Sequence, residues 1–327
     1  MNNLKTVSPS PHIRANISTS SIMRDVVIAL IPSLICSVFY FGFRALYLTV
    51  LSVVFCVGFE FLWQKITKKP VTISDGTAVV TGMLLAFNLP VTVPFWIPLI
   101  GAFVAIIIAK QFYGGVGNNF INPALTGRAF LLASWPVLMT RWVMPHKTGF
   151  FIDADLVSSA TPLAIIKSGE ATGELLSLSD MFLGNIGGCI GETSSLALLI
   201  GGVYLIARKV ISPKIPVSYI LTVAVLTYIF PYENMTSVSS MLASILGGGL
   251  MLGAIFMATD YVTSPITKKG RLIMGLGCGI LTFVIRRFGA SPEGVTYAIL
   301  IMNVATPLID RWTKPKVYGS LKKGGVK

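Results

Sequence analysis

Charged residues are scarce in this chain of 327 residues. They make up 12% of it, whereas a soluble domain carries roughly 25%. Hydrophobic residues reach 54%, and the mean hydropathy is +0.77. So little polar surface excludes an ordinary soluble domain, and the composition predicts a protein that crosses a membrane several times.

Motifs for metals and nucleotides are also missing. The two histidines cannot build a histidine-based metal site, the four cysteines have no CxxC spacing, and no P-loop occurs. We predict no metal site and expect the cysteines to be small apolar residues. The alternative is a metal cluster shared with another subunit. The cysteines are Cys36, Cys56, Cys189 and Cys278.

Long apolar runs dominate what is present, and a membrane helix needs about 20 mostly apolar residues. The first run follows a polar start and has no small-residue cleavage pattern, so we interpret it as a retained helix rather than a signal peptide. Ten candidate segments cover residues 22–43, 45–63, 77–91, 93–109, 123–139, 191–208, 215–232, 238–258, 271–287 and 293–311.

Lysine and arginine are distributed unevenly between these segments. Nineteen of the 26 lie in the two tails and the even-numbered connections, and six lie on the opposite side. Basic residues favour the cytoplasmic side, so we predict a multi-pass protein of a bacterial or archaeal cytoplasmic membrane with both termini in the cytoplasm. The net charge of +13 then comes from basic residues at the membrane surface. We expect these residues to contact membrane lipid and not nucleic acid.

The acidic segment 140–190 then faces outward and separates two halves of five segments each. Five is odd, so the second half enters from the opposite side. The predicted fold is all-α, with about ten transmembrane segments in two inverted five-helix repeats. The predicted divisions are a cytoplasmic tail (1–21), the first repeat (22–139), the extracytoplasmic segment (140–190), the second repeat (191–312) and a basic cytoplasmic tail (313–327).

Two segments at matching positions are predicted to be broken helices. The third, 77–91, is short and ends in Asn88-Leu89-Pro90, and the eighth contains Gly247-Gly248-Gly249. Fifteen residues reach about 22 Å, less than a hydrocarbon core of about 30 Å. Discontinuous helices of this kind surround sites near the membrane midplane. The alternative is that the glycines serve close helix packing.

A glycine-rich connection precedes the fifth segment. Asn122 followed by proline is typical of a helix N-cap, and Gly114 and Gly115 would let backbone N–H groups approach a ligand. The stretch is no dinucleotide fingerprint, because the third glycine and a preceding strand are missing. A ligand site and a plain surface turn both remain open.

Carboxylates within or beside apolar segments cost roughly 2.5–3.5 kcal/mol at mid-helix. Glu192, Asp260 and Asp310 are therefore candidates for an ion pathway, as is Glu60. The alternative is that they are hydrated or cap helix ends. Arg286 and its neighbour Arg287 flank the outer end of the ninth segment. We expect them to reach toward the membrane surface; the alternative is that they receive a flavin phosphate or an acidic partner.

Several separate stretches, in this order, resemble one family: the D subunits of Rnf complexes and, more distantly, the B subunits of sodium-pumping NADH:quinone reductases. The likeness covers nearly all of residues 20–316. The matching stretches are residues 107–117, 122–124, 160–163, 191–194, 257–260, 286–289 and 307–310.

The resemblance implies a covalent flavin. The family's flavinylation pattern falls on Asp155, Ser158, Ser159, Ala160 and Thr161, with serine in place of the usual glycine at 159. Thr161 would accept FMN from FAD through a flavin transferase, on the outward side. The family also holds a non-covalent riboflavin, whose contacts the resemblance does not assign; the glycine-rich connection is the candidate.

The resemblance also implies a fold similar to urea and ammonium channels, with two inverted five-helix repeats. Rnf complexes pass electrons between reduced ferredoxin and NAD and export Na⁺ or H⁺. The chain would be one membrane relay, inactive alone, beside iron–sulfur, NADH-binding and FMN-bearing subunits. The alternatives are a subunit of the quinone reductase, and a flavin-free channel or transporter of the same fold.

Overall fold

The computed structural model describes residues 18–145, 161–168, 177–289 and 293–315. Every regular element within these residues is a helix, which confirms the all-α prediction. The first half contains α1 (Thr19–Phe41), α2 (Phe43–Ile66), η1 (Ile73–Asp75), α3 (Thr77–Phe87), α4 (Trp96–Phe103), η2 (Val104–Gln111), α5 (Pro123–Ser134) and α6 (Pro136–Met139).

Two short helices come next, and the second half follows them. The short helices are α7 (Pro162–Ser168) and α8 (Leu178–Leu183). The second half contains α9 (Ser195–Ala207), α10 (Lys214–Ile229), α11 (Ser237–Leu246), α12 (Leu250–Leu252), η3 (Gly253–Met257), α13 (Lys268–Phe288) and α14 (Val295–Thr313).

Each of the ten predicted segments overlaps at least one of these helices, but few helices are both long and apolar enough to span a membrane alone. Within the described residues, α1 and α2 pass a test of length and apolarity, and the bent pair formed by α11 and α12–η3 makes a third if it is counted as one span. The ten crossings and the inverted repeat therefore stay predictions.

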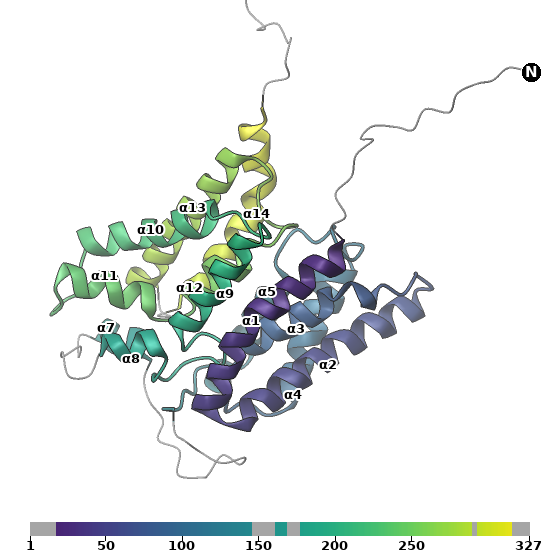
Figure 1. Ribbon diagram of the computed structural model, residues 1–327, viewed down its shortest axis with the longest axis horizontal. Helices are drawn as coiled ribbons and strands as arrows, with labels where there is room; N and C mark the ends of the chain where they lie inside the picture. The colour runs from purple at the N-terminus through teal and green to yellow at the C-terminus, as the bar shows by residue number, and fades with distance from the viewer. Residues whose placement is uncertain (1–17, 146–160, 169–176, 290–292, 316–327) are drawn as a thin grey trace, which may run out of the picture.

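The two halves lie side by side and meet along several helices (Figure 1). In the first half, α2 packs on α3 and α4; in the second, α10 packs on α13 and α11. The halves meet where α1 contacts α9 and α5 contacts α14. Helices α7 and α8 lie beside α11 at one edge.

Local sequence determines where several helices begin. The side chains of Ser18, Asn122 and Thr267 each accept a backbone N–H at the start of α1, α5 and α13, which supplies a partner that the helix itself lacks. Asn122 is the N-cap that the sequence predicts, with Pro123 at the first helical position. Gly42, at φ 73°, joins α1 to α2 in a conformation that glycine adopts at little cost.

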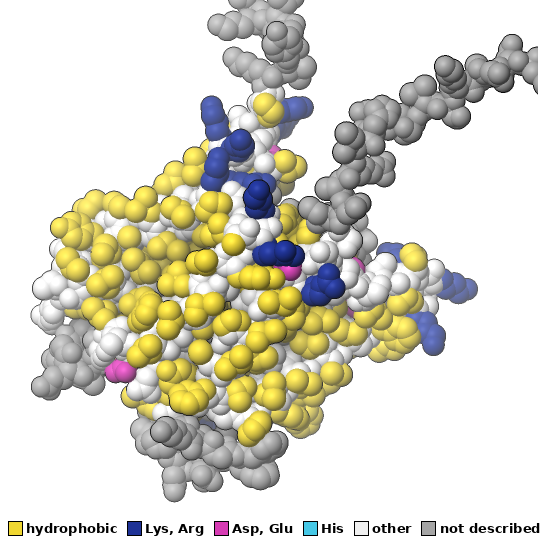
Figure 2. Space-filling model, in the orientation of Figure 1, with side chains coloured by type: hydrophobic (Ala, Val, Ile, Leu, Met, Phe, Trp, Pro, Cys, Tyr) yellow, Lys and Arg dark blue, Asp and Glu magenta, His cyan; other side chains and the backbone are white. Residues whose placement is uncertain are grey.

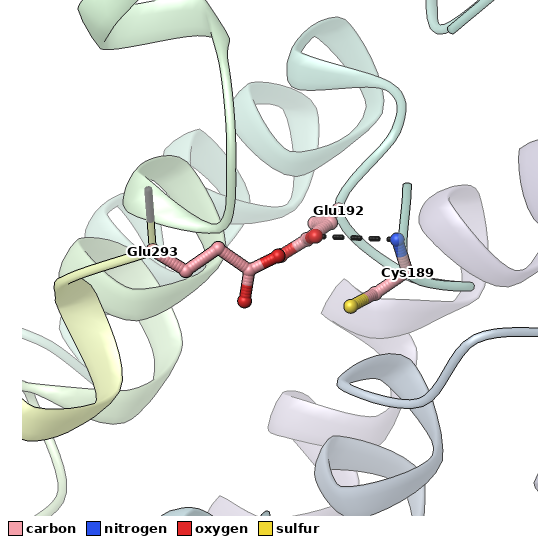
Figure 3. A group of neighbouring side chains, drawn as sticks. All are labelled: Cys189, Glu192 and Glu293. Carbon is pink, nitrogen blue, oxygen red and sulfur yellow. Dashed lines mark hydrogen bonds between the residues drawn. The ribbon is translucent and has the colours of Figure 1, made fainter. Parts of the chain in front are cut away.

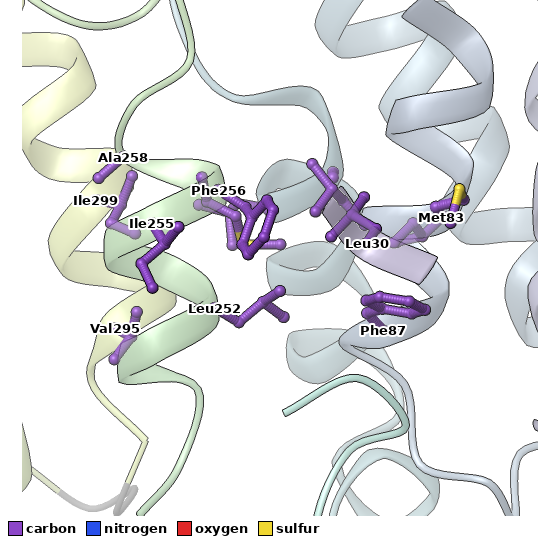
Figure 4. Close-up of a cluster of buried hydrophobic side chains, with 14 of the residues drawn as sticks. Leu30, Met83, Phe87, Leu252, Ile255, Phe256, Ala258, Val295 and Ile299 are labelled. Atoms are coloured by element: carbon purple, nitrogen blue, oxygen red, sulfur yellow. The ribbon is translucent and has the colours of Figure 1, made fainter. Parts of the chain in front are cut away.

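A buried apolar cluster joins the two halves (Figure 4). Leu30 of α1 and Phe87 of α3 lie opposite Leu252 and Phe256 of the second half, and all four are at most 6% exposed. Gly201 of α9 permits the close approach to α1, because a Cβ there would meet the carbonyl oxygen of Ala29. Small residues allow helices to pack closely in this way.

The outer surface is strongly apolar. Figure 2 shows hydrophobic side chains over most of the visible face, with Lys and Arg gathered toward one end. Phe39, Val203 and Phe288 are 67%, 65% and 78% exposed. Only 28% and 33% of the most apolar windows of α1 and α2 are buried. Lipid would cover such a surface, as expected for a membrane protein.

The helix breaks fall where the sequence places them. Helix α3 has only 11 residues and ends at Phe87. Helices α11 and α12–η3 are bent by 62° at the break between Leu246 and Leu250. Gly248 has φ +52°, a conformation that strains other residues. Both breaks lie near the contact between the halves and position the groups described next.

Candidate functional site

A cavity of about 330 Å³ lies between the two halves. We call it the inter-half cavity. Its walls come from α1, α3, the connection before α5, the end of α9 and the stretch from Phe256 to Val262. Its volume is at the lower end of the range for small-molecule sites. Most of the lining is apolar, including Val26, Val80, Leu84 and Phe256.

A few polar groups converge on this cavity. Asn119, Asn122, Thr77, Lys110 and Asp260 all line it. Asn122 also donates to the carbonyl oxygen of Met257 (3.2 Å) and so ties the two halves together. An apolar pocket with a few fixed polar groups is the usual form of a cofactor site.

Lys110 differs from its predicted placement. It falls just after the predicted segment 93–109, in the connection to the fifth segment, but it lies at the end of η2, 3% exposed, and pairs with Glu60 at 2.8 Å. Its ammonium group also donates to the Thr77 hydroxyl, and Gln111 donates to Glu60 (2.9 Å). A buried charge needs such a partner, so Glu60 serves as the counter-ion of a lysine beside the cavity.

The glycines of the connection before α5 have a structural role. Gly114 and Gly115 have φ of 113° and 91°, which few other residues adopt. The Gly115 N–H donates to the Lys110 carbonyl oxygen (3.1 Å). Neither glycine lines the inter-half cavity, whereas Val116 and Asn119 of the same connection do. Of the residues that the sequence offers for a second flavin, only Asn122 borders the cavity.

A second buried group of charges lies beside the C-terminal end of α3 and the middle of α5. Arg128 donates to the Asn88 side chain (2.6 Å) and pairs with Glu293. It also contacts the Cys189 sulfur (3.5 Å). Glu192 accepts the N–H of Cys189 (3.2 Å). Figure 3 shows Glu293 reaching toward Cys189 and Glu192, which lie three positions apart in one stretch. We call these five residues the Arg128 cluster.

The Arg128 cluster contains three potential metal ligands. One atom each of Cys189, Glu192 and Glu293 lies within 4.8 Å of the others. The Arg128 guanidinium, however, already bonds both Glu293 and Cys189, and a metal ion beside it would be repelled. The cluster therefore fits a buried ion pair better than a metal site. Cys56 and Cys278 lie in the apolar core as predicted.

The break between α11 and α12 is stabilised by two charged side chains. Arg286, 2% exposed, donates to the carbonyl oxygens of Ser244 (2.6 Å), Gly247 (3.2 Å) and Gly248 (3.1 Å). Glu192 accepts the Gly249 N–H (2.9 Å) on the other side. The prediction that Arg286 reaches the membrane surface is wrong, because the helix break leaves carbonyl groups that need a donor.

Thr161 begins α7. Its hydroxyl accepts the Ala164 N–H (3.3 Å), and the residue is 7% exposed. Leu163 packs in a small apolar cluster with Met181 and Ala243, and Lys167 donates to the carbonyl oxygen of Gly289. The other residues of the flavinylation pattern, Asp155, Ser158, Ser159 and Ala160, lie outside the described residues.

One family model matches residues 6–319 of the chain. The chain belongs to the NQR2, RnfD, RnfE family. This match extends over almost the whole sequence, including both halves and the segment between them. It confirms the resemblance found in the sequence.

Curated relatives within this family match the chain over nearly its full length. The D subunit of a Na(+)-translocating ferredoxin:NAD(+) oxidoreductase complex from Acetobacterium woodii is 52% identical, and the match covers 98% of each chain. Its counterpart in a proton-translocating complex from Clostridium ljungdahlii is 44% identical over 97% of each. The D subunit of an ion-translocating oxidoreductase complex from Stutzerimonas stutzeri is 39% identical over 94% of each.

The three other carboxylates predicted as ion-pathway candidates lie apart from one another. Asp260 lines the inter-half cavity and accepts the Thr263 hydroxyl (3.1 Å). Asp310 accepts the Ile266 N–H (3.1 Å) near the start of α13. Glu192 belongs to the Arg128 cluster. The structure thus brings no two of these three carboxylates together.

Sequence reasoning missed the partners of the buried charges. Arg128 stands alone within an apolar segment, which was a signal that it needs an internal acid. Its partner Glu293 is 165 positions away, and Lys110 and Glu60 are 50 apart. Nothing in the local pattern indicates either pairing.

Proposed function

We propose that the chain is a D-type subunit of an ion-translocating ferredoxin:NAD⁺ oxidoreductase complex in a prokaryotic cytoplasmic membrane. One observation carries the proposal: a relative so named is 52% identical over 98% of both chains. The partners would be the iron–sulfur, NADH-binding and FMN-bearing subunits, because the chain has no motif for NADH or iron–sulfur clusters.

Thr161 is the proposed attachment point of a covalent FMN. The Thr161 hydroxyl would attack the pyrophosphate of FAD, AMP would leave, and FMN would remain as a phosphoester. A flavin transferase would supply the metal and the base that takes the hydroxyl proton. The hydroxyl is the group that this chemistry needs, and its oxygen also accepts the Ala164 N–H. Bound FMN would accept and donate electrons one at a time.

The inter-half cavity is the proposed place of a non-covalent riboflavin. Its apolar walls suit a flat aromatic ring, and Asn119, Asn122 and Asp260 offer hydrogen bonds to a pyrimidine edge or a sugar alcohol chain. The ion pair of Lys110 with Glu60 closes one wall without leaving a net charge. These residues would bind and orient the ring and exclude water.

For the coupled ion, Na⁺ or H⁺, we propose Glu192, Asp260 and Asp310 as candidates. Buried carboxylates in membrane proteins commonly mark ion routes. Of the three, Asp260 alone borders the inter-half cavity. Its position makes it the first to replace by the neutral amide.

We further propose ten crossings with both termini in the cytoplasm and Thr161 on the outer side. In support, exposed Lys and Arg side chains gather at one end of the molecule (Figure 2). The ends of α2 and α14 and the start of α13 carry such residues.

The test of the flavin site is a comparison of variants. The chain is co-expressed with a flavin transferase, denatured in detergent and examined for flavin fluorescence on the protein band. Thr161→Ala should lose the fluorescence completely, because the ester oxygen is gone. Ser168→Ala removes an exposed hydroxyl of the same helix outside the flavinylation pattern and should keep it.

No fluorescence on the unaltered chain, with the transferase active on another acceptor, would count against the covalent flavin and favour the channel-like alternative.

The cavity needs a separate test. Val80 lines it and Val79, equally part-buried on α3, does not. Val80→Trp should expel riboflavin measured after acid release, and Val79→Trp should retain it. Equal retention in both would place riboflavin elsewhere.

A further inference from the structure

A second cavity, of about 350 Å³, lies next to the inter-half cavity. It is bordered by the connection from α9 to α10, the stretch after η3 and the start of α13. We call it the basic cavity, because two basic residues and no acidic residue line it. It shares one wall with the inter-half cavity, formed by Val210, Ile211, Thr259 and Tyr261.

The two basic residues are Lys209 and Arg271. Neither takes part in any ion pair among the described residues. The Arg271 Nε donates to the carbonyl oxygen of Pro265 (3.2 Å), which fixes the plane of the guanidinium. Lys209 is exposed and follows the end of α9. The cavity therefore carries positive charge that no carboxylate of its lining neutralises.

The remaining lining suits a phosphate group with something apolar attached to it. Ser212 and Ser264 add hydroxyl donors. Ile206 and Ile215 form an apolar part of the wall, and Ile206 is 37% exposed on the outer apolar surface of α9. Guanidinium, ammonium and hydroxyl groups together are the usual partners of phosphate oxygens.

We propose that the basic cavity binds a phosphate group, carried either by an anionic phospholipid or by a soluble phosphate compound. Basic pockets between membrane helices bind phospholipid head groups, and the cavity borders the start of α13, where Lys268 and Lys269 precede Arg271. The proposal does not depend on the flavin sites. The shared wall would make occupancy of this cavity stiffen one side of the inter-half cavity.

The test uses the full chain, purified and stripped of lipid in an uncharged detergent. Binding is measured by thermal stabilisation with phosphatidylglycerol, with diacylglycerol, which has no phosphate, and with inorganic phosphate against chloride at equal ionic strength. Lys209→Gln should weaken binding of the phosphate probe about fivefold, as expected for one basic residue at a membrane surface. Arg271→Gln should weaken it at least as much.

Lys68→Gln is the matched control. Lys68 and Lys209 are both exposed and both have a left-handed backbone, with φ of 54° and 57°, so the two substitutions carry the same backbone cost. Lys68 lines neither cavity, and its substitution should leave binding unchanged.

Binding of phosphatidylglycerol alone, sensitive to Lys209→Gln, identifies a lipid ligand. Binding of inorganic phosphate with the same sensitivity identifies a soluble one. The proposal is overturned if neither probe binds, if diacylglycerol stabilises as well as phosphatidylglycerol, or if Lys209→Gln and Lys68→Gln behave alike.

Discussion

The two helix breaks of this protein are stabilised by different means. After α3, the N–H groups of Ile190 and Gly191 donate to the carbonyl oxygens of Leu89 and Phe87 (both 3.0 Å), so backbone satisfies backbone. After α11, the charged side chain of Arg286 supplies the donors and Glu192 supplies the acceptor. One short stretch, residues 190–192, thus contacts both breaks.

Each break also has one arginine that binds carbonyl groups. Arg44 donates to Val91 (2.8 Å) and Val93 (3.1 Å) from a half-buried position. Arg286 does the same for three carbonyls but is 2% exposed. Water can replace a half-buried donor and cannot reach a buried one. Hydrogen bonds from an arginine to carbonyl oxygens should therefore contribute very different amounts to the free energy of unfolding in the two halves.

The largest expected effect is that of Arg286→Ala. Two buried carbonyl oxygens and one part-buried one would lose their donor, and each unsatisfied group costs about 1–3 kcal/mol. We expect a loss of more than about 4 kcal/mol in the free energy of unfolding, measured by denaturation in detergent. The control is Arg287→Ala. Arg287 is next to Arg286 in the chain, but it is half-buried and donates to one carbonyl oxygen, that of Pro231. Similar losses in both variants would refute the comparison.

Glu192→Gln should have an intermediate effect. The amide keeps the size of the side chain but has one acceptor oxygen for the two N–H groups of Cys189 and Gly249. We expect a loss of about 2 kcal/mol and faster hydrogen exchange at Gly249. The control is Glu233→Gln, at an exposed carboxylate. Unchanged exchange at Gly249 would show that the charge of Glu192 does not stabilise the break.

The smallest effect is expected for Arg44→Ala, at about 1 kcal/mol. Val91 and Val93 are buried, but Arg44 is only half-buried, so its removal lets water reach the two carbonyl oxygens from the side of the lost guanidinium. The same unfolding measurement applies, with Arg44→Lys keeping the charge but only part of the hydrogen-bonding geometry. If Arg44→Ala costs as much as Arg286→Ala, burial does not distinguish the two breaks.

The helices could be predicted because hydropathy, caps and breaks are local properties. Ten apolar stretches, the N-cap at Asn122 and the interruption at Gly247-Gly248-Gly249 are all visible in neighbouring residues. The resemblance to the family was equally accessible, because its stretches are short and ordered. The structure leaves the number of membrane crossings as a prediction.

The charged groups could not be placed in the same way. Lys110 looks like a surface lysine until its partner Glu60, on another helix, is known. Arg286 looks like a surface anchor until the carbonyl groups freed by the break are seen beside it. Each depends on which helices become neighbours, and hydropathy does not determine that.

The position of Thr161 limits how far a group attached to it could travel. Leu163, two residues later, is packed among buried apolar side chains, and two residues extend at most about 7 Å. A carrier esterified to Thr161 would therefore be held on a very short tether, without the swinging motion of a long arm. Its exchange partners would have to come within reach of the flavin itself, so the distance for electron tunnelling would be determined by how the neighbouring proteins of the complex pack around α7.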